Sequence, residues 1–256
     1  LLQQEAEMFK SKSKILQLTV TLTACAFLFV PIILSVMAGV TANYFQGISS
    51  GFTLKWVYRV WELYADSIFL SLWLAIACLI STLIIGLPAA YGLARHPGWL
   101  SRILEEFISL PLAVPGLALA LALLQLYGSM KGFRVSWTFI LVGHVLYTLP
   151  FMVRSILAVL VSMDLKTLEE GAASLGASPW QRFRDIVVPN AMPGILAGAL
   201  TVVTLSIGEF NLTWMLHTPY LKTLPVGLAD SYASMRLEVA SAYTLVFFVL
   251  IVPLLM

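Results

Sequence analysis

The sequence has very little charge for its length. Of its 256 residues, 11% are Asp, Glu, Lys or Arg, whereas 60% are hydrophobic. Soluble domains carry about 25% charged residues, so this composition excludes an ordinary soluble domain. It instead predicts a protein embedded in a lipid bilayer. The net charge of +2 argues neither for nor against a nucleic-acid partner.

Motifs for catalysis and metal binding are also missing. Cys25 and Cys78 stand in separate apolar runs without a CxxC or other metal-ligand spacing, and we interpret both as small hydrophobic residues. No lysine follows a glycine, so the Gly-Lys-Ser/Thr phosphate loop of an ATPase is absent. HExxH does not occur, GxSxG does not occur within the spans, and three scattered histidines do not make a zinc site. We therefore expect no enzymatic activity, cofactor or metal in this chain.

Long apolar runs are what the sequence does have. A membrane helix needs about 20 apolar residues. Six segments qualify, at about residues 15–40, 67–93, 103–127, 137–161, 192–216 and 239 to the end. Membrane strands are about 11 residues long and alternate strictly, which these runs do not. The sequence predicts an all-α membrane protein, with a cytoplasmic segment 1–14 and a six-helix transmembrane bundle, 15–256.

The cationic residues predict the orientation of the chain. Lys10, Lys12 and Lys14 precede the first span, and no lysine or arginine follows them for about 40 residues. Positive residues favour the cytoplasmic side, so the N-terminus is predicted to be cytoplasmic. Six spans then place the polar loop of about residues 162–190, between the fourth and fifth spans, on the same side.

This polar loop carries the signals for two short helices joined by a turn. Apolar residues at helical spacing favour a first helix over about 165–175, and Gly176 suits a left-handed cap at its end. Ser178 can cap a second helix with Pro179 at its first position. Pro189 is expected to stop that second helix at the membrane.

The first of these helices carries Glu169 and Glu170 beside an apolar face. A helical pair with an apolar face and a few charges suits docking to a partner protein. An amphipathic loop that lies on the bilayer surface would show the same pattern, and the residues alone leave both interpretations open.

The third span contains Pro111 and Pro115, and each removes a backbone hydrogen bond that has to be replaced inside a membrane. The pattern fits either kinked packing or a helix that is broken where it lines a translocation path.

The outer loop before the second span holds a group of aromatic residues, which fits an interfacial belt or a contact surface for a partner: Trp56, Tyr58, Trp61 and Tyr64. Lys222, Arg236 and Glu238 are better placed for such a contact.

Polar residues inside the spans are candidates for a substrate path. Glu209 and Asn211 lie in the fifth span, while His144 and Tyr147 lie about one turn apart in the fourth and could share a face with Glu209. Glu209 fits a pore-facing carboxylate that contacts a cationic substrate, and it equally fits a group that hydrogen-bonds a neighbouring helix. A single histidine in a bundle is more often structural.

The spacing within the polar loop resembles a known motif. Glu170-Gly171-Ala172 is followed by three residues, Gly176, nine residues and then Ile186-Val187-Val188-Pro189. This resembles the EAA loop of bacterial ABC importer permeases, E-A-A-x3-G-x9-I-x-L-P, with Gly171 and Val188 as the two departures. The stretches 110–116 and 208–210 are also similar to permeases of the sulfate, molybdate, polyamine and iron type, so the resemblance covers essentially the whole chain.

The resemblance implies a permease subunit of a type I, binding-protein-dependent importer in the bacterial inner membrane. Its implied partners are a second permease subunit, a cytoplasmic ATPase dimer that holds ATP and Mg, and an extracytoplasmic solute-binding protein. Glu170 would pair with a basic residue of the ATPase, and the substrate would be a small polar solute such as a polyamine. The implied coupling residues all lie in the loop: Glu169, Glu170, Gly171, Ala172, Gly176, Ile186 and Pro189.

A secondary transporter or channel that works alone is the alternative. Such a protein more often has internal repeats or several buried charges along an ion path. The spans show no clear repeat, and Glu209 is their one deep acidic residue. A neighbouring ATPase and a secreted binding protein would favour the importer.

Overall fold

The computed structural model is helical along the part of the chain that it describes, which is the backbone of residues 2–255 and the side chains of residues 14–253. The chain divides into two compact units. One contains residues up to 63 together with 231–246, and the other contains residues 64–230 together with those from 247 onward. All residues of the candidate site described below lie in the second unit.

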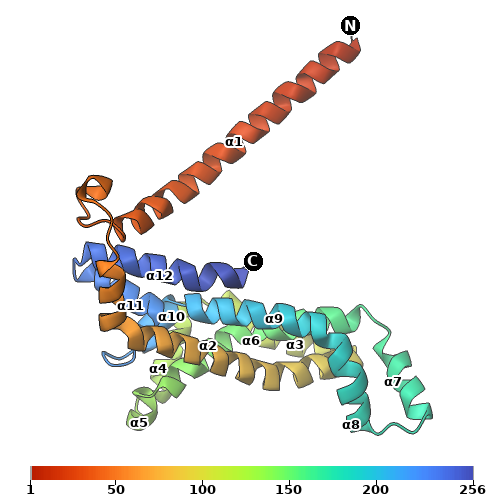
Figure 1. Cartoon of the computed structure of the whole chain (residues 1–256). Coiled ribbons are helices and arrows are strands. Elements are labelled where there is room, and N and C mark those ends of the chain that lie inside the picture. The colour runs from red at the N-terminus through yellow and green to blue at the C-terminus, as the bar shows by residue number, and fades with distance from the viewer. Residues whose placement is uncertain (1, 256) are drawn as a thin grey trace. The chain divides into compact units, whose positions relative to one another are not determined.

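The long helices carry the apolar runs (Figure 1). Their bounds are α1 (Leu2–Ala38), α2 (Lys55–Arg95), α3 (Trp99–Ala113), α4 (Gly116–Tyr127), α6 (Trp137–Val161), α9 (Val188–Gly208) and α12 (Leu237–Leu255). Shorter elements join them: η1 (Gly47–Ser50), α5 (Lys131–Arg134), α7 (Leu165–Ser174), α8 (Pro179–Arg182), η2 (Phe183–Val187), α10 (Asn211–Leu216) and α11 (Leu224–Ala233).

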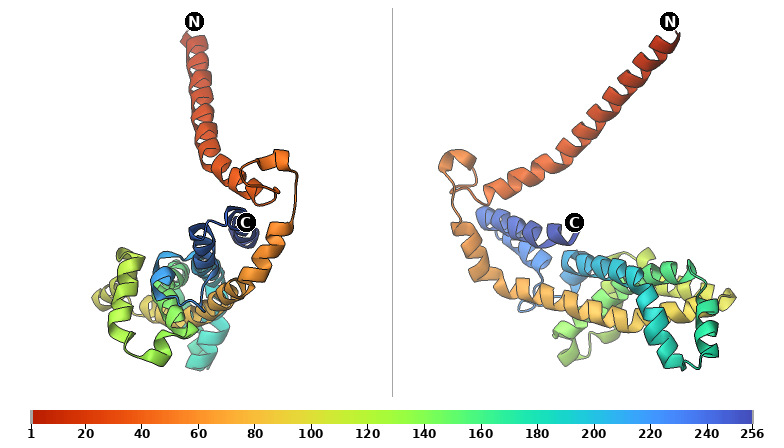
Figure 2. Two further views of the ribbon diagram at one scale, coloured as in Figure 1. Left: turned by 90° about the vertical axis from the view of Figure 1, so that its left-hand side faces the viewer. Right: turned by 45° about the vertical axis from the view of Figure 1, so that its right-hand side comes forward.

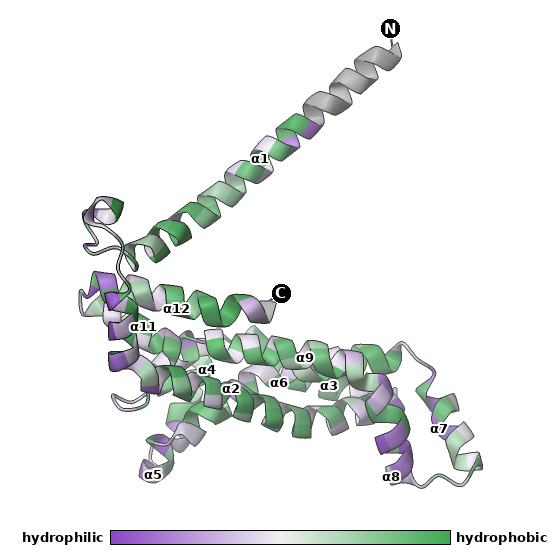
Figure 3. Ribbon diagram, viewed as in Figure 1, coloured by the Kyte–Doolittle hydropathy of each residue, from purple (hydrophilic) through white to green (hydrophobic). Residues whose placement is uncertain are grey.

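Among the residues that the structure describes, four continuous helices are long and apolar enough to cross a membrane: Lys14–Ala38, Lys55–Arg95, Trp137–Val161 and Pro179–Gly208. The bent pair α3–α4 qualifies as a fifth span if counted together, and Leu237–Pro253 is a shorter apolar helix. Each of the six predicted segments thus falls on helix, and the all-α membrane fold is confirmed. Figure 3 shows apolar residues along α2, α9 and α12, whereas polar residues gather on α8 and part of α7.

Helix α2 begins well before its apolar run. It starts at Lys55, so Trp56, Tyr58, Trp61 and Tyr64 belong to this helix, and their predicted place in a loop is wrong. The polar residues of its first turns lower the hydropathy without breaking the helix, because neither proline nor glycine occurs between Lys55 and Gly86.

The third predicted span is broken rather than kinked. Helices α3 and α4 meet at an angle of 103°. Val114 between them is extended, with φ −97° and ψ 128°, because the ring of Pro115 disfavours a helical conformation for the residue before it. Pro115 then leads directly into α4 at Gly116.

The fifth predicted span is also discontinuous. A single helix over 192–216 was expected, but α9 ends at Gly208, and α10 starts at Asn211. Glu209 between them is extended, with φ −70° and ψ 121°. Hydropathy gives no sign of this break, since apolar residues continue on both sides of it.

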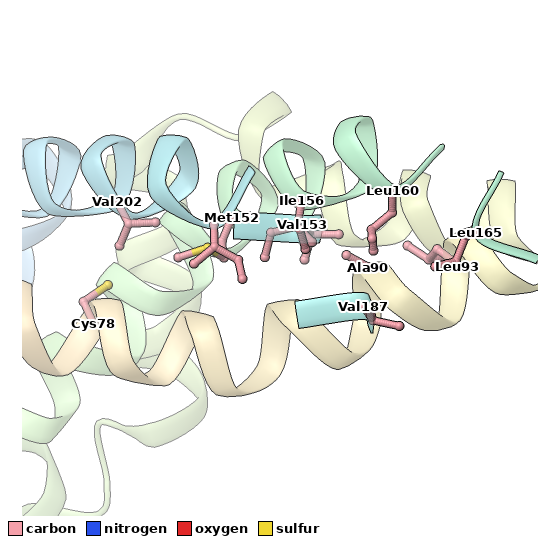
Figure 4. Close-up of a cluster of buried hydrophobic side chains, with 12 residues drawn as sticks. Cys78, Ala90, Leu93, Met152, Val153, Ile156, Leu160, Leu165, Val187 and Val202 are labelled. Carbon is pink, nitrogen blue, oxygen red and sulfur yellow. The ribbon is translucent and has the colours of Figure 1, made fainter. Parts of the chain in front are cut away.

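The centre of the second unit is the contact between α6 and α9, whose side chains form a buried cluster with α2 (Figure 4). Two glycines let the helices approach closely. A Cβ atom on Gly194 would lie 2.6 Å from the carbonyl oxygen of Ser155, and one on Gly198 would lie 2.8 Å from the sulfur of Met152. Small residues four positions apart are the usual means of close helix packing in membranes.

Candidate functional site

The loop of residues 164–189 projects from one end of the long helices in the second unit, as Figures 1 and 2 show in green to teal. Asp164 caps its first helix, α7, by accepting a 3.2 Å hydrogen bond from the backbone N–H of Thr167. The Thr167 hydroxyl also donates to Asp164, at 2.6 Å. These two bonds lower the pKa of the Asp164 carboxyl below its usual value, because they stabilise the charged form.

The turn of the loop forms as predicted. Gly176 has a φ of +86°, which L side chains rarely adopt, and the N–H of Ala177 bonds back to the carbonyl of Ala172 at 3.0 Å. Ser178 caps α8 in a capping box. Its hydroxyl accepts from the N–H of Gln181 at 3.3 Å, and its own N–H donates to the Gln181 side chain at 2.7 Å.

Pro189 does not stop the second helix of the loop, so that prediction is wrong. The chain runs through the π-helical turn η2 straight into α9, and Pro179–Gly208 forms one helical segment of 30 residues. Pro189 sits in the first turn of α9. The wider π turn just before it shifts the backbone bonding, so the proline ring is accommodated without ending the helix.

The two carboxylates of α7 have different surroundings. Glu169 is 4% exposed and accepts a 2.6 Å hydrogen bond from the hydroxyl of Tyr91 on α2. The guanidinium of Arg95 lies 3.6 Å from Glu169 and also donates to the Tyr91 hydroxyl at 2.8 Å. The ring of Tyr91 packs edge-on against Phe183 of η2, with centroids 5.4 Å apart. Glu169 is therefore an internal anchor of the loop.

Glu170, in contrast, is directed to the outside. Its side chain is 67% exposed, and Lys166 lies 3.8 Å away in the preceding turn of α7. Gly171 and Gly176 are exposed as well, while Ala172 and Ile186 are half-buried. The tip also presents large apolar side chains: Leu168, Leu175 and Trp180. Leu175 is 91% exposed.

A cavity of about 400 Å³ lies between the loop and the ends of α2 and α6. Its charged lining comes from Arg95, Asp164, Lys166, Glu169, Glu170 and Arg182. The Nε atom of Arg182 is buried and has no hydrogen-bond partner among the side chains that the structure describes. A buried guanidinium nitrogen without an acceptor is costly, and the side chain that carries it belongs to the lining of this cavity.

The second group of predicted residues lies at the break between α9 and α10. Glu209 is 9% exposed. Its carboxylate accepts hydrogen bonds from the N–H of Leu212 at 3.0 Å and from the N–H and hydroxyl of Thr213, both at 2.9 Å. Glu209 thus caps α10, the helix that directly follows it in the chain.

His144 on α6 connects this break to its neighbours and is 1% exposed. Its Nδ1 lies 2.8 Å from the hydroxyl of Ser206, and its Nε2 lies 2.8 Å from the hydroxyl of Thr213. Since Thr213 donates its single hydroxyl proton to Glu209, it accepts from His144. The proton of the neutral imidazole therefore sits on Nε2, and Ser206 donates to Nδ1.

Thr213 thus links His144 to Glu209. Tyr147 makes its ring contact with Phe151, at 6.2 Å, and Asn211 is exposed at the start of α10. Ser206 and Thr213 were not predicted as site residues. Small polar residues within an apolar run are the sequence signal that could have indicated them.

The two helix breaks meet. A Cβ atom on Gly116, the first residue of α4, would lie 3.6 Å from Cβ of Asn211 and 3.7 Å from the carboxylate of Glu209. The N-termini of α4 and α10 therefore both come close to Glu209. A carboxylate is stabilised there, since helix N-termini carry partial positive charge.

Residues proposed for an outer contact surface have partners within the chain. Lys222 pairs with Asp230 at 3.0 Å, and Glu238 accepts a 3.3 Å hydrogen bond from the N–H of Tyr44. Both pairs therefore hold local structure, whatever else their side chains contact.

Comparison with known proteins gives a consistent result. Residues 82–256 match the family described as binding-protein-dependent transport system inner membrane component. The 2-aminoethylphosphonate transport system permease protein PhnV of Salmonella typhimurium is 27% identical over 205 residues, or 79% of this chain and 77% of that protein. The spermidine/putrescine transport system permease protein PotC of Escherichia coli is 27% identical over 205 residues, or 78% and 76% of the two chains.

A solved structure supports the fold. A chain of the MetNI methionine ABC transporter, in an inward-facing conformation, superposes with a TM-score of 0.64. The match covers 77% of this chain and 93% of that chain at 17% sequence identity. It shows that the helices of the two chains are arranged alike.

Proposed function

From the membership of this chain in the binding-protein-dependent transport system inner membrane component family, as a permease subunit of an ABC importer, we infer that its 164–189 loop docks on a separate ATPase and transmits ATP-driven movement to the spans. The ATPase carries ATP and Mg. A second permease subunit completes the translocation path, and an extracytoplasmic binding protein delivers the solute.

One observation carries this proposal: the loop is anchored to α2 on its inner side and presents exposed apolar and charged side chains on its outer side. Tyr91 and Arg95 bind Glu169, while Glu170, Leu175 and Trp180 are exposed. An exposed apolar tip with a carboxylate beside it suits a groove in a partner protein. The cavity beside it, which Arg95, Lys166 and Arg182 help to line, would receive an acceptor from the same partner.

Docking to an ATPase fixes the orientation, since ATP is cytoplasmic. The loop then lies on the cytoplasmic side, together with the N-terminus. The three lysines before the first span agree with this orientation.

The translocation path is proposed to pass the two breaks, where Glu209, Asn211 and His144 lie, with Tyr147 one turn further along α6. Broken helices with their N-termini directed at one place are typical of substrate sites in transporters. The solute is proposed to be small and polar. A polyamine is the first to test because PotC is named for spermidine and putrescine, and an aminophosphonate is the second because PhnV is named for one.

The coupling role is tested by copurification with the proposed ATPase partner. Glu170→Ala and Gly176→Trp are expected to reduce assembly or ATP turnover in the complex. Glu106→Ala, which removes an exposed carboxylate on α3 outside the loop, is the matched control and should behave as wild type. Normal assembly and turnover of both loop variants would overturn the proposed docking.

The alternative, a transporter that works alone, is tested with the same protein. Vesicles that contain only this chain are loaded and assayed for putrescine, 2-aminoethylphosphonate and sulfate flux under a proton or sodium gradient. The importer proposal expects no gradient-driven flux and expects uptake only with the ATPase, the binding protein and ATP. Gradient-driven flux by the chain alone would establish the alternative.

A further inference from the structure

Helices α6 and α9 connect the 164–189 loop to the α9–α10 break. Helix α6 ends at Val161, just before Asp164, and α9 continues from η2 without interruption. Both ends of the loop therefore run into the same pair of helices. Gly194 and Gly198 pack this pair at backbone contact, and protein interiors packed in this way transmit displacement instead of absorbing it.

His144 lies at the far end of this helix pair. Its imidazole joins α6 to α9 through Ser206 and to α10 through Thr213, each at 2.8 Å. Thr213 in turn holds the carboxylate of Glu209 beside Gly116 of α4. Because these groups are buried, moving one helix without the others would break a hydrogen bond and leave a buried polar atom without a partner. This cost favours movement of the helices together.

We infer that His144 is a positioning residue that transmits movement of the α6–α9 pair to the α9–α10 break. The inference rests on the proposed docking of the 164–189 loop, and it adds the residue through which that movement reaches the break. The Nε2–H of His144 orients the Thr213 hydroxyl, and this hydroxyl orients Glu209. The chain of bonds sets the position of α10 relative to α4.

Two substitutions separate this role from simple packing. His144→Leu fills much of the same space but removes both hydrogen bonds. In His144→Gln, the amide nitrogen can donate to Thr213 and the amide oxygen can accept from Ser206, so the chain of bonds can be rebuilt. Ser206→Ala removes one of the two bonds and leaves the imidazole in place. Thr201→Val, which removes an exposed hydroxyl from α9, is the control.

The experiment uses the complete importer in lipid and two cysteine reporters in a Cys25→Ser, Cys78→Ser background. The serine at position 78 keeps a hydroxyl within reach of Thr148, which contacts Cys78 at 3.1 Å. Leu175→Cys reports docking of the loop, and Asn211→Cys reports the α9–α10 break. Maleimide labelling rates are compared for the permease alone, the nucleotide-free complex and the complex trapped with ATP and vanadate.

We expect the ATPase to slow maleimide labelling of Leu175→Cys, whichever residue stands at position 144. We expect ATP and vanadate to change the labelling of Asn211→Cys by about fivefold or more, which is the lower end of typical coupling between sites. His144→Leu should reduce this change to less than about twofold, Ser206→Ala should reduce it partly, and His144→Gln and Thr201→Val should preserve it.

Three results would overturn these ideas separately. If Leu175→Cys with His144 intact is not protected by the ATPase, the proposed docking fails, and transmission from the ATPase fails with it. If Leu175→Cys is protected but the labelling of Asn211→Cys changes equally with histidine or leucine at position 144, the proposed role of His144 is overturned while the proposed docking stands. If His144→Leu prevents assembly, Ser206→Ala decides, and an undiminished response in that variant would refute the inference.

Discussion

The hydroxyl of Tyr91 donates a 2.6 Å hydrogen bond to Glu169, a carboxylate that lies 78 residues away in the sequence. The ring of the same tyrosine packs on Phe183, so Tyr91 contacts both arms of the 164–189 loop. A loop that moves as one body needs such a fixed base. Tyr91 and Arg95 supply it from the end of α2.

Removing the Tyr91 hydroxyl should therefore loosen the loop without unfolding the bundle. In Tyr91→Phe the ring contact persists, but buried Glu169 loses a donor, at a cost of about 1–3 kcal/mol. The rate of tryptic cleavage after Lys166 is proportional to the fraction of molecules in which the loop is open. In Tyr91→Phe this rate should be about tenfold higher than in the wild type. Tyr58→Phe alters an exposed tyrosine of α2 and serves as control. Equal cleavage rates in the two variants would contradict the anchoring role.

Two glycines of the loop should respond in opposite ways to the same substitution. Gly176 needs its positive φ, so Gly176→Ala should destabilise the loop by about 1–2 kcal/mol. Gly171 lies inside α7, and a Cβ there would meet nothing within 4 Å. Gly171→Ala should stabilise α7 by about 0.5–1 kcal/mol.

Hydrogen exchange of the α7 amides measures both effects. Exchange should be faster in Gly176→Ala and slower in Gly171→Ala than in the wild type. A stabilising Gly176→Ala would mean that the turn does not need its left-handed residue.

Signals contained within a few residues predicted the structure well. The cap at Gly176 and the Ser178–Pro179 start depend on neighbours at most five positions away, so the sequence states them directly. The apolar runs likewise predicted where the spans lie. In the third span the prolines left a kink and a break both open, and the structure has the break at Val114, the residue before Pro115.

Features that depend on distant residues could not be predicted in the same way. Glu169 and Glu170 look alike in sequence, and only the approach of α2 makes one an internal anchor. Hydropathy continues across the break at Glu209, because that break is stabilised by side-chain bonds to α10 and not by a proline. Ser206 and Thr213 acquire their role only from His144 on another helix.

The contact between α6 and α9 should tolerate almost no added volume at Gly194. A Cβ there would lie 2.6 Å from the Ser155 carbonyl oxygen, which is backbone and cannot swing away. Gly194→Ala should cost about 1–3 kcal/mol and lower the Tm by about 2–4 °C for each kcal/mol. Gly92→Ala on α2, where a Cβ would meet nothing within 4 Å, should leave the Tm unchanged or slightly raised. Thermal unfolding in detergent tests both, and an unchanged Tm in Gly194→Ala would show that the helices can separate freely.

Glu209 offers the most direct test between a structural and a substrate-contacting carboxylate. In Glu209→Gln one of the two oxygens becomes an N–H₂ group that cannot accept, so the N–H of either Leu212 or Thr213 loses its acceptor. Loss of a helix cap costs about 0.5–2 kcal/mol, so exchange of at least one of these two amides should become about 3- to 30-fold faster. Asn211→Ala, at the exposed neighbouring position, should leave their exchange unchanged. If Glu209→Gln instead leaves the amides protected but abolishes ATP-driven putrescine uptake, the carboxylate serves the solute and not the helix.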